Sequence, residues 1–131
     1  MRVPANFTAM GQVVRSGDTE ACARAETEAT KLGLRAAALA VAGAFHSPIM
    51  APAAERLRQA LASAEIAEPR CPVYSNVTGA PHAADADSIR AKLVEQLTSP
   101  VLWADTAAAL ASSRPAGSLH ELAPGKTLAG L

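Results

Sequence analysis

The chain has 131 residues, with 12 Lys and Arg against 12 Asp and Glu, so its formal net charge is zero when histidine is neutral. This balance, and the lack of any basic run, argues against a nucleic-acid-binding protein. The hydrophobic fraction of 50% is too high for a disordered chain. No apolar stretch reaches the roughly 18 residues of a membrane span, and the N-terminus lacks the apolar region of a secretory signal. We therefore expect a globular, cytoplasmic protein that binds neither nucleic acid nor membranes.

Alanine dominates the apolar residues, with 32 copies, while aromatic residues make up only 3%. Because each alanine buries little apolar area, we expect the core to contribute little stabilising free energy, and the fold to be marginally stable. Cys22 and Cys71 lie far apart in the sequence and have no metal-ligand spacing. We expect two free thiols rather than a disulfide, and no metal site.

The first third of the chain predicts a strand, a helix and a second strand. Residues 12–14 form a short apolar run that a Ser-Gly-Asp turn closes, which is typical of a strand. Residues 19–32 have helical spacing of small and apolar residues, with Asp18 or Thr19 as the cap and Gly33 after the end. Residues 34–42 are predicted to form a buried strand. This layer has no partner strands of its own.

The middle of the chain predicts two helices and a strand. A helix begins after Ser47, which can cap it, with Pro48 in the favoured first position. Its apolar face consists of Met50, Ala53, Ala54, Leu57 and Leu61. Residues 71–75 are predicted to form a strand. Residues 85–97 are predicted to form a second helix, which Pro100 ends.

The remaining segments are short. Residues 106–112 predict a helix and residues 118–122 a strand, and Pro124 opens a terminal helix of barely one turn. Because strands alternate with helices along the chain, we expect an α/β fold.

His46 is the strongest candidate for chemistry, because it lies between a predicted strand and a helix, where catalytic groups are often held. On position alone, an ordinary loop histidine is the alternative. His82 and His120 lack this context, and we assign them to solvent or ordinary hydrogen bonds. Gln96 borders an apolar helix face and needs a partner. Asn6 and Gln12 flank the first strand and indicate nothing alone.

Six short motifs occur here in one order and spacing: Pro4-Ala5-Asn6-Phe7, Gly11-Gln12-Val13-Val14, Ala44-Phe45-His46-Ser47-Pro48 with Met50, Pro72-Val73-Tyr74-Ser75-Asn76-Val77, Gln96-Leu97 with Pro100-Val101 and Trp103, and Pro124-Gly125-Lys126. Together they resemble the C-terminal part of malonyl-CoA:acyl-carrier-protein transacylase. The acyltransferase domains of polyketide synthases share the pattern. The resemblance covers nearly all of the chain.

The resemblance implies a fold and a division of the chain. The family has an α/β-hydrolase-like large subdomain with an inserted ferredoxin-like small subdomain. Residues 1–41 match the second half of the small subdomain, and residues 42–131 match the C-terminal part of the large one. This division explains why the first predicted strands lack partners.

The resemblance also implies a ping-pong mechanism. A serine in a Gly-x-Ser-x-Gly turn takes malonyl from malonyl-CoA and passes it to the phosphopantetheine thiol of acyl carrier protein, without a further cofactor. His46 matches the general base, and Gln96 matches the glutamine whose backbone carbonyl orients it. Asn6 and Gln12 match the stretch that lines the cleft. Phe45 directly precedes His46, so we expect its ring either beside the acyl chain, as in the malonyl-selective polyketide-type acyltransferases that it resembles here, or in the core as an ordinary aromatic residue.

One departure decides what the chain can do alone. No Gly-x-Ser-x-Gly motif occurs in it, and a histidine base without its serine has nothing to activate. We therefore expect a truncated acyltransferase that is inactive alone. Two alternatives remain open. The chain is a non-catalytic remnant or split-enzyme half that binds a carrier protein or a missing N-terminal partner, or it is a fragment of a polyketide-type acyltransferase.

Overall fold

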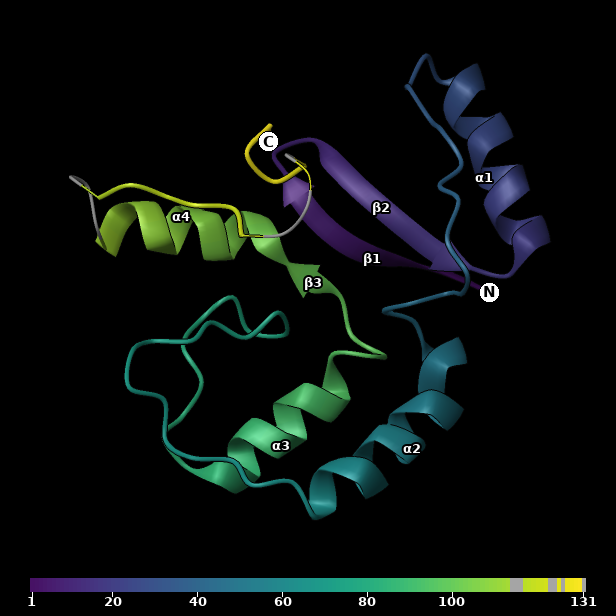
Figure 1. Cartoon of the computed structure of the whole chain (residues 1–131). Coiled ribbons are helices and arrows are strands. Elements are labelled where there is room, and N and C mark those ends of the chain that lie inside the picture. Colours follow the sequence, from purple (N-terminus) through teal and green to yellow (C-terminus); the bar gives the residue numbers. More distant parts are fainter. Residues whose placement is uncertain (114–116, 123–124, 126, 131) are drawn as a thin grey trace.

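The computed structural model describes residues 1–113, 117–122, 125 and 127–130 (Figure 1). Helices and strands both occur, which confirms the α/β class in its general form. Their order is β1 (Arg2–Ala9), β2 (Gln12–Gly17), α1 (Thr19–Lys31), the 3-10 helix η1 (Pro48–Met50), α2 (Ala51–Ala62), α3 (Ala86–Glu95), β3 (Val101–Leu102) and α4 (Trp103–Ser113).

The sheet has three strands in the order β2-β1-β3. β1 and β2 form an antiparallel hairpin, and Gly11 at its tip has a φ of 79°, which glycine adopts without strain. Only part of β2 was predicted, and β1 and β3 were missed. β1 contains Pro4 and Asn6, which are poor strand formers, and its register shifts beside both residues. β3 pairs with β1 in parallel, opposite Asn6 and Phe7.

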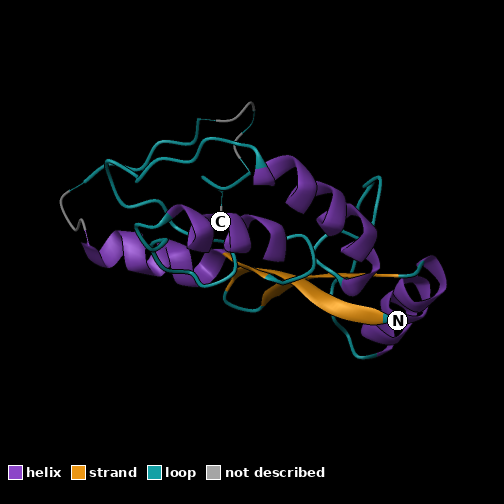
Figure 2. Cartoon of the chain, turned by 90° about the horizontal axis from the view of Figure 1, so that it is seen from below, coloured by secondary structure: helices purple, strands orange, loops and turns teal. Residues whose placement is uncertain are grey.

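α1 confirms the first predicted helix and its cap. The carboxylate of Asp18 accepts a hydrogen bond of 2.8 Å from the backbone N–H of Ala21, and Gly33 follows the helix with a φ of 73°. The same carboxylate binds the N-terminal ammonium group of Met1. This ammonium group, and then the Ala21 bond, lower the pKa of Asp18. Figures 1 and 2 show α1 at the end of the hairpin near the N-terminus.

α2 and α3 lie side by side (Figure 1). The guanidinium group of Arg90 on α3 joins them, because it donates to the backbone carbonyls of Leu61 at 3.1 Å and Ala64 at 2.8 Å. These carbonyls lie at and just beyond the end of α2, where a helix lacks partners for its last carbonyls. α3 is the predicted helix 85–97 with shorter bounds, and the Asp85 side chain caps it through a 2.8 Å bond from the Ser88 N–H.

Three predicted strands are wrong or reduced. Residues 34–42 form no strand, and Leu34, Leu39 and Val41 remain exposed, because no neighbouring strand in the described part of the chain pairs with them. Residues 71–75 contribute only a single bridge, between Tyr74 and Pro81. Residues 118–122 are irregular, with exposed leucines.

The predicted helix 106–112 is confirmed as part of the longer α4, which packs against β1. The predicted terminal helix begins at Pro124, which lies outside the described residues, as do Lys126 and Leu131. Thr127–Gly130 form a turn.

The buried apolar core is small and rich in alanine, as the composition predicts. Its described members are Ala5, Ala54, Ile89, Val94 and Val101. Over the described residues, no helix combines the length and the apolar character that crossing a bilayer requires. Both cysteines, Cys22 and Cys71, are free.

Candidate active site

His46 lies in a tight turn directly before η1. The hydroxyl of Ser47 is fully buried and donates a 2.6 Å bond back to the carbonyl of Ala44. Ser47 was predicted to cap the following helix with this side chain. It does occupy the capping position of η1, but its side chain makes no capping bond. Instead it closes the turn that carries Phe45 and His46.

The backbone of His46 has a φ of 58°, the only positive φ among the described residues other than glycine. This left-handed conformation is unfavourable for a residue with a Cβ atom, and histidine, asparagine and aspartate tolerate it best. Unusual backbone of this kind gathers at functional sites, where the surrounding structure holds it in place. The conformation is therefore a reason, independent of position in the sequence, to examine His46 as a site residue.

The imidazole of His46 reaches the end of α3. Its Nδ1 lies 2.7 Å from the backbone carbonyl oxygen of Gln96, a residue fifty positions along the chain. A carbonyl oxygen only accepts hydrogen bonds, so Nδ1 must carry the proton. In the neutral ring this leaves the Nε2 lone pair available to accept a proton from another group.

Gln96 occupies the C-terminal cap position of α3. The last carbonyls of a helix have no partner within the helix, and they carry partial negative charge. The His46 Nδ1–H satisfies one of these carbonyls, so the imidazole lies at the negative end of the α3 dipole. The structure thus brings together two of the residues that the sequence singled out.

Phe45 is 42% exposed and does not belong to the core. Its ring lies over Gly43, since a Cβ atom on that glycine would be 3.6 Å from Cε2 of the ring and 3.9 Å from the sulfur of Met50. An exposed ring beside His46 can contact a bound group.

No protein-family model matches the chain. It is 39% identical over 128 residues to the malonyl CoA-acyl carrier protein transacylase of Bacillus subtilis, covering 97% of this chain and 40% of that protein. It is 38% identical over 130 residues to the transacylase of Mycobacterium tuberculosis, covering 98% and 42%. The chain matches the C-terminal portion of malonyl CoA-acyl carrier protein transacylases.

Solved structures agree with these relatives. The transacylase of Coxiella burnetii superposes with a TM-score of 0.91 at 36% identity, covering 100% of this chain and 41% of that one. A malonyl-transacylase solved in complex with a type II polyketide synthase acyl-carrier protein also has a TM-score of 0.91, at 38% identity, with 100% and 42% covered. The chain thus spans about two fifths of the transacylases it matches.

Asn6 and Gln12, the other positions suggested by the transacylase resemblance, lie on the hairpin. Asn6 is half-buried in the central strand β1, between Val14 and Val101. Gln12 is exposed at the start of β2. Among the described residues, no hydrogen bond joins either of them to His46, so their roles stay predictions.

A hydrogen bond between the side chains of Asn76 and Gln96 was not expected from the sequence or from the resemblance to transacylases. The side-chain amide of Asn76 donates a 3.0 Å bond to the side-chain oxygen of Gln96. Asn76 lay within a motif used for the resemblance, but nothing in its sequence context pointed to Gln96. The two residues are distant in sequence, and only the folded chain reveals the bond.

A groove of about 750 Å³ lies between α2 and α3, and its lining includes Ala54, Arg58 and Arg90. Neither His46 nor Phe45 lines it. We place the candidate site at His46 rather than in this groove, because the groove's charged groups are engaged in bonds within and between the two helices.

Proposed function

We propose that this chain is the base-bearing C-terminal part of an acyltransferase that moves a malonyl group from CoA to the phosphopantetheine thiol of acyl carrier protein, in fatty acid synthesis. The observation that supports it is the 2.7 Å contact between Nδ1 of His46 and the Gln96 carbonyl. This contact fixes the tautomer that a general base needs, in a chain similar to proteins named malonyl CoA-acyl carrier protein transacylase.

In this proposal, Nε2 of His46 takes the proton of a serine hydroxyl as the serine oxygen attacks the thioester carbon of malonyl-CoA. The Gln96 carbonyl stabilises the imidazolium that forms. The imidazolium returns the proton to the departing CoA sulfur, which leaves malonyl bound to the serine oxygen. His46 then takes the proton of the carrier thiol as its sulfur attacks the malonyl ester, and gives this proton back to the serine.

The serine itself comes from polypeptide outside this sequence in our proposal. No Gly-x-Ser-x-Gly motif occurs in the 131 residues, and the chain spans about 40% of the Bacillus subtilis relative. The chain alone then supplies the base but no nucleophile, and we propose that it has no transacylase activity alone.

The finer features expected from the resemblance belong to the same proposal. Residues 1–41 would form the second half of a ferredoxin-like subdomain and residues 42–131 the C-terminal part of an α/β-hydrolase-like one. Asn6, Gln12 and Phe45 would line the cleft. The reaction would need no metal or cofactor beyond its two substrates, and it would take place in the cytoplasm.

A chimera tests this proposal. The chain would replace the corresponding C-terminal portion of the Bacillus subtilis transacylase, and malonyl transfer from malonyl-CoA to a fatty acid acyl carrier protein would be followed by mass spectrometry. We expect transfer by the chimera and none by the chain alone. His46→Ala in the chimera should lower kcat by at least about a hundredfold, the range of general base catalysis.

The matched control is His82→Ala in the same chimera, which should leave kcat unchanged. A chimera that keeps its activity after His46→Ala would contradict the proposed role. Turnover by the 131-residue chain alone would contradict the need for an external serine. A chimera that loads only a polyketide carrier protein would favour the polyketide-type alternative.

A further inference from the structure

The side chain of Gln96 bonds Asn76, whereas its backbone carbonyl contacts His46. Its oxygen accepts the 3.0 Å bond from the Asn76 amide, while its backbone carbonyl lies 2.7 Å from the His46 ring. The backbone carbonyl of Asn76 accepts a 2.8 Å bond from the N–H of Leu102 in β3. Asn76 therefore connects the edge of the sheet to the residue that contacts His46.

Gln96 needs such an anchor, because it lies where the regular helix ends. After Glu95 the chain tightens into turns, in which the N–H of Leu97 bonds the Val94 carbonyl at 3.2 Å and that of Thr98 bonds the Glu95 carbonyl at 3.1 Å. Peptide planes in such a terminal turn are less constrained than in the helix interior. A bond to the Gln96 side chain restricts the rotation of the peptide that holds the acceptor.

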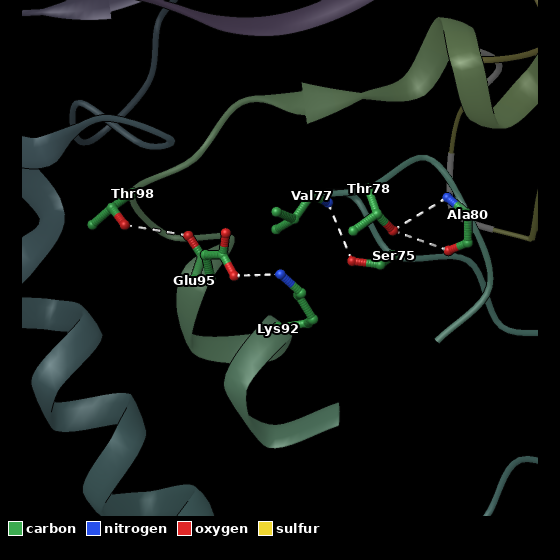
Figure 3. A network of polar contacts seen from close by, with 7 residues as sticks. All are labelled: Ser75, Val77, Thr78, Ala80, Lys92, Glu95 and Thr98. Carbon is green, nitrogen blue, oxygen red and sulfur yellow. Dashed lines mark hydrogen bonds and ion pairs between the residues drawn. The ribbon is translucent and has the colours of Figure 1, made fainter. Parts of the chain in front are cut away.

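Asn76 is itself held on a compact turn. The hydroxyl of Ser75, which is 3% exposed, accepts a 3.2 Å bond from the N–H of Val77. The backbone of Ser75 bonds both Ala80 and Gly79 at 2.9 Å. Figure 3 shows this turn facing the end of α3, where Lys92 pairs with Glu95. Both partners of the Asn76–Gln96 bond are thus carried by segments with their own internal bonds.

We propose that Asn76 is a positioning residue: its carboxamide holds Gln96 so that the Gln96 carbonyl keeps the His46 imidazole in the form protonated at Nδ1. The importance of this form for catalysis rests on the proposed function. The positioning itself does not, because it concerns only contacts within this chain.

The test is to measure the tautomer of His46 by nitrogen-15 NMR on the 131-residue chain, at a pH where the imidazoles are neutral. In the unsubstituted chain we expect the Nδ1–H form to dominate. In Asn76→Leu, which keeps the side-chain size but removes the donor, the ratio of Nδ1–H to Nε2–H should fall at least about threefold, as expected for the loss of part of one hydrogen bond.

Two controls separate this effect from general loosening. Thr78→Val removes both side-chain bonds between Thr78 and the backbone of Ala80 from the same turn without touching Gln96, and it should leave the His46 ratio unchanged. The signals of His82 and His120 should not respond to either substitution. If Asn76→Leu does not fold, Gln96→Leu removes the same bond from the other side and should lower the ratio to a similar degree.

Three results would overturn the proposal. They are an Nε2–H form that dominates in the unsubstituted chain, an unchanged ratio in folded Asn76→Leu, and an equal fall in Thr78→Val. In an active chimera, Asn76→Leu should also lower kcat about tenfold with little change in KM, because misplacing a catalytic group slows the chemical step. A failure of the proposed function would be an inactive chimera with the tautomer result intact. A failure of this proposal would be an active chimera whose kcat does not change in Asn76→Leu, together with an unchanged tautomer ratio in that variant.

Discussion

At the scale of single residues, the turn around His46 combines an unfavourable backbone with a fixed ring. The φ at His46 is 58°, and the buried Ser47 hydroxyl closes the turn around it with a bond to the Ala44 carbonyl. The ring is held by the Gln96 carbonyl. Both constraints are ones that the proposed general-base role of His46 requires, since they fix the position of the ring.

Phe45 offers a prediction about which acyl group the site accepts. If its ring lies against the malonyl group, it leaves no room for a methyl branch on that group. Phe45→Ser in the chimera should lower the ratio of kcat/KM for malonyl-CoA over methylmalonyl-CoA at least about tenfold, which is a change of roughly 1.4 kcal/mol. Phe45→Leu, which keeps most of the bulk, is the matched control. An unchanged ratio with both rates lowered would mean that Phe45 only supports the turn.

Gly79 offers a prediction about stability. It is buried, its φ is 63°, and an added Cβ atom would lie 3.0 Å from Cβ of Asp105. Gly33 has a similar φ of 73° but open space around the same position. Gly33→Ala should therefore cost about 1 kcal/mol from the backbone alone, and Gly79→Ala should cost about 2 kcal/mol or more, from backbone and crowding together.

Urea unfolding followed by circular dichroism measures both variants. Equal costs for the two substitutions would show that the packing of the turn against α4 contributes nothing. In that case the turn that carries Asn76 would be free to shift.

At the scale of elements, α3 matters most, because its end carries Gln96. Its start depends on the Asp85 carboxylate, which accepts the Ser88 N–H. This backbone bond lowers the pKa of Asp85 below its ordinary value of 3.8. The ionised cap therefore stabilises the helix at neutral pH, and this stabilisation is lost as the pH falls below 3.8 and through the lower pKa of the folded chain.

We predict that Asp85→Asn removes the contribution of Asp85 to the pH dependence of the free energy of unfolding. The helix cap itself should remain, because asparagine caps helices about as well as aspartate. The measurement is the free energy of unfolding between about pH 2 and pH 7, from urea titrations at each pH. The unsubstituted chain should lose more stability on acidification than Asp85→Asn does. Asp18→Asn is a useful comparison, because the Asp18 carboxylate not only caps α1 but also binds the N-terminal ammonium group. Asp18→Asn therefore removes an ion pair that Asp85→Asn does not. Identical pH profiles for the chain and Asp85→Asn would contradict the prediction.

At the scale of the whole molecule, the core is small and several large apolar side chains face outward. Leu34, Leu39 and Val41 are 61%, 59% and 64% exposed, all within the irregular segment between α1 and η1. Exposed apolar side chains close together favour association. Residues 32–42 are all exposed, so we expect this segment to contribute little to the free energy of unfolding.

We predict that replacing these three side chains together, as Leu34→Gln, Leu39→Gln and Val41→Thr, changes the free energy of unfolding by less than about 0.5 kcal/mol and raises solubility. Val101→Thr is the control, because Val101 is buried in β3, and an unpaired hydroxyl there should cost about 1–3 kcal/mol. Chemical denaturation and light scattering measure the two effects. If the triple variant loses as much stability as Val101→Thr, the segment is packed more tightly than its exposure indicates.

The sequence alone determined what depends on neighbours within a few residues. α1 and α3, with their capping aspartates, follow from spacing and capping rules, since both act across one turn of helix. The strand predicted for residues 34–42 was wrong, because an apolar run becomes a strand only if another strand pairs with it. His46 and Gln96 were singled out separately by their local context, and their pairing was expected only from the resemblance to a family.

The tertiary structure decided what joins distant parts of the chain. β1 is the central strand of the sheet because β3 pairs with it in parallel. This pairing places Asn6 beside Val101, which lies far along the sequence. The bond from Asn76 to Gln96 likewise has no local signature. Such contacts form because folding places donors and acceptors together once the helices and strands have packed. Periodicity and capping do not encode them, since both operate only between residues close along the chain.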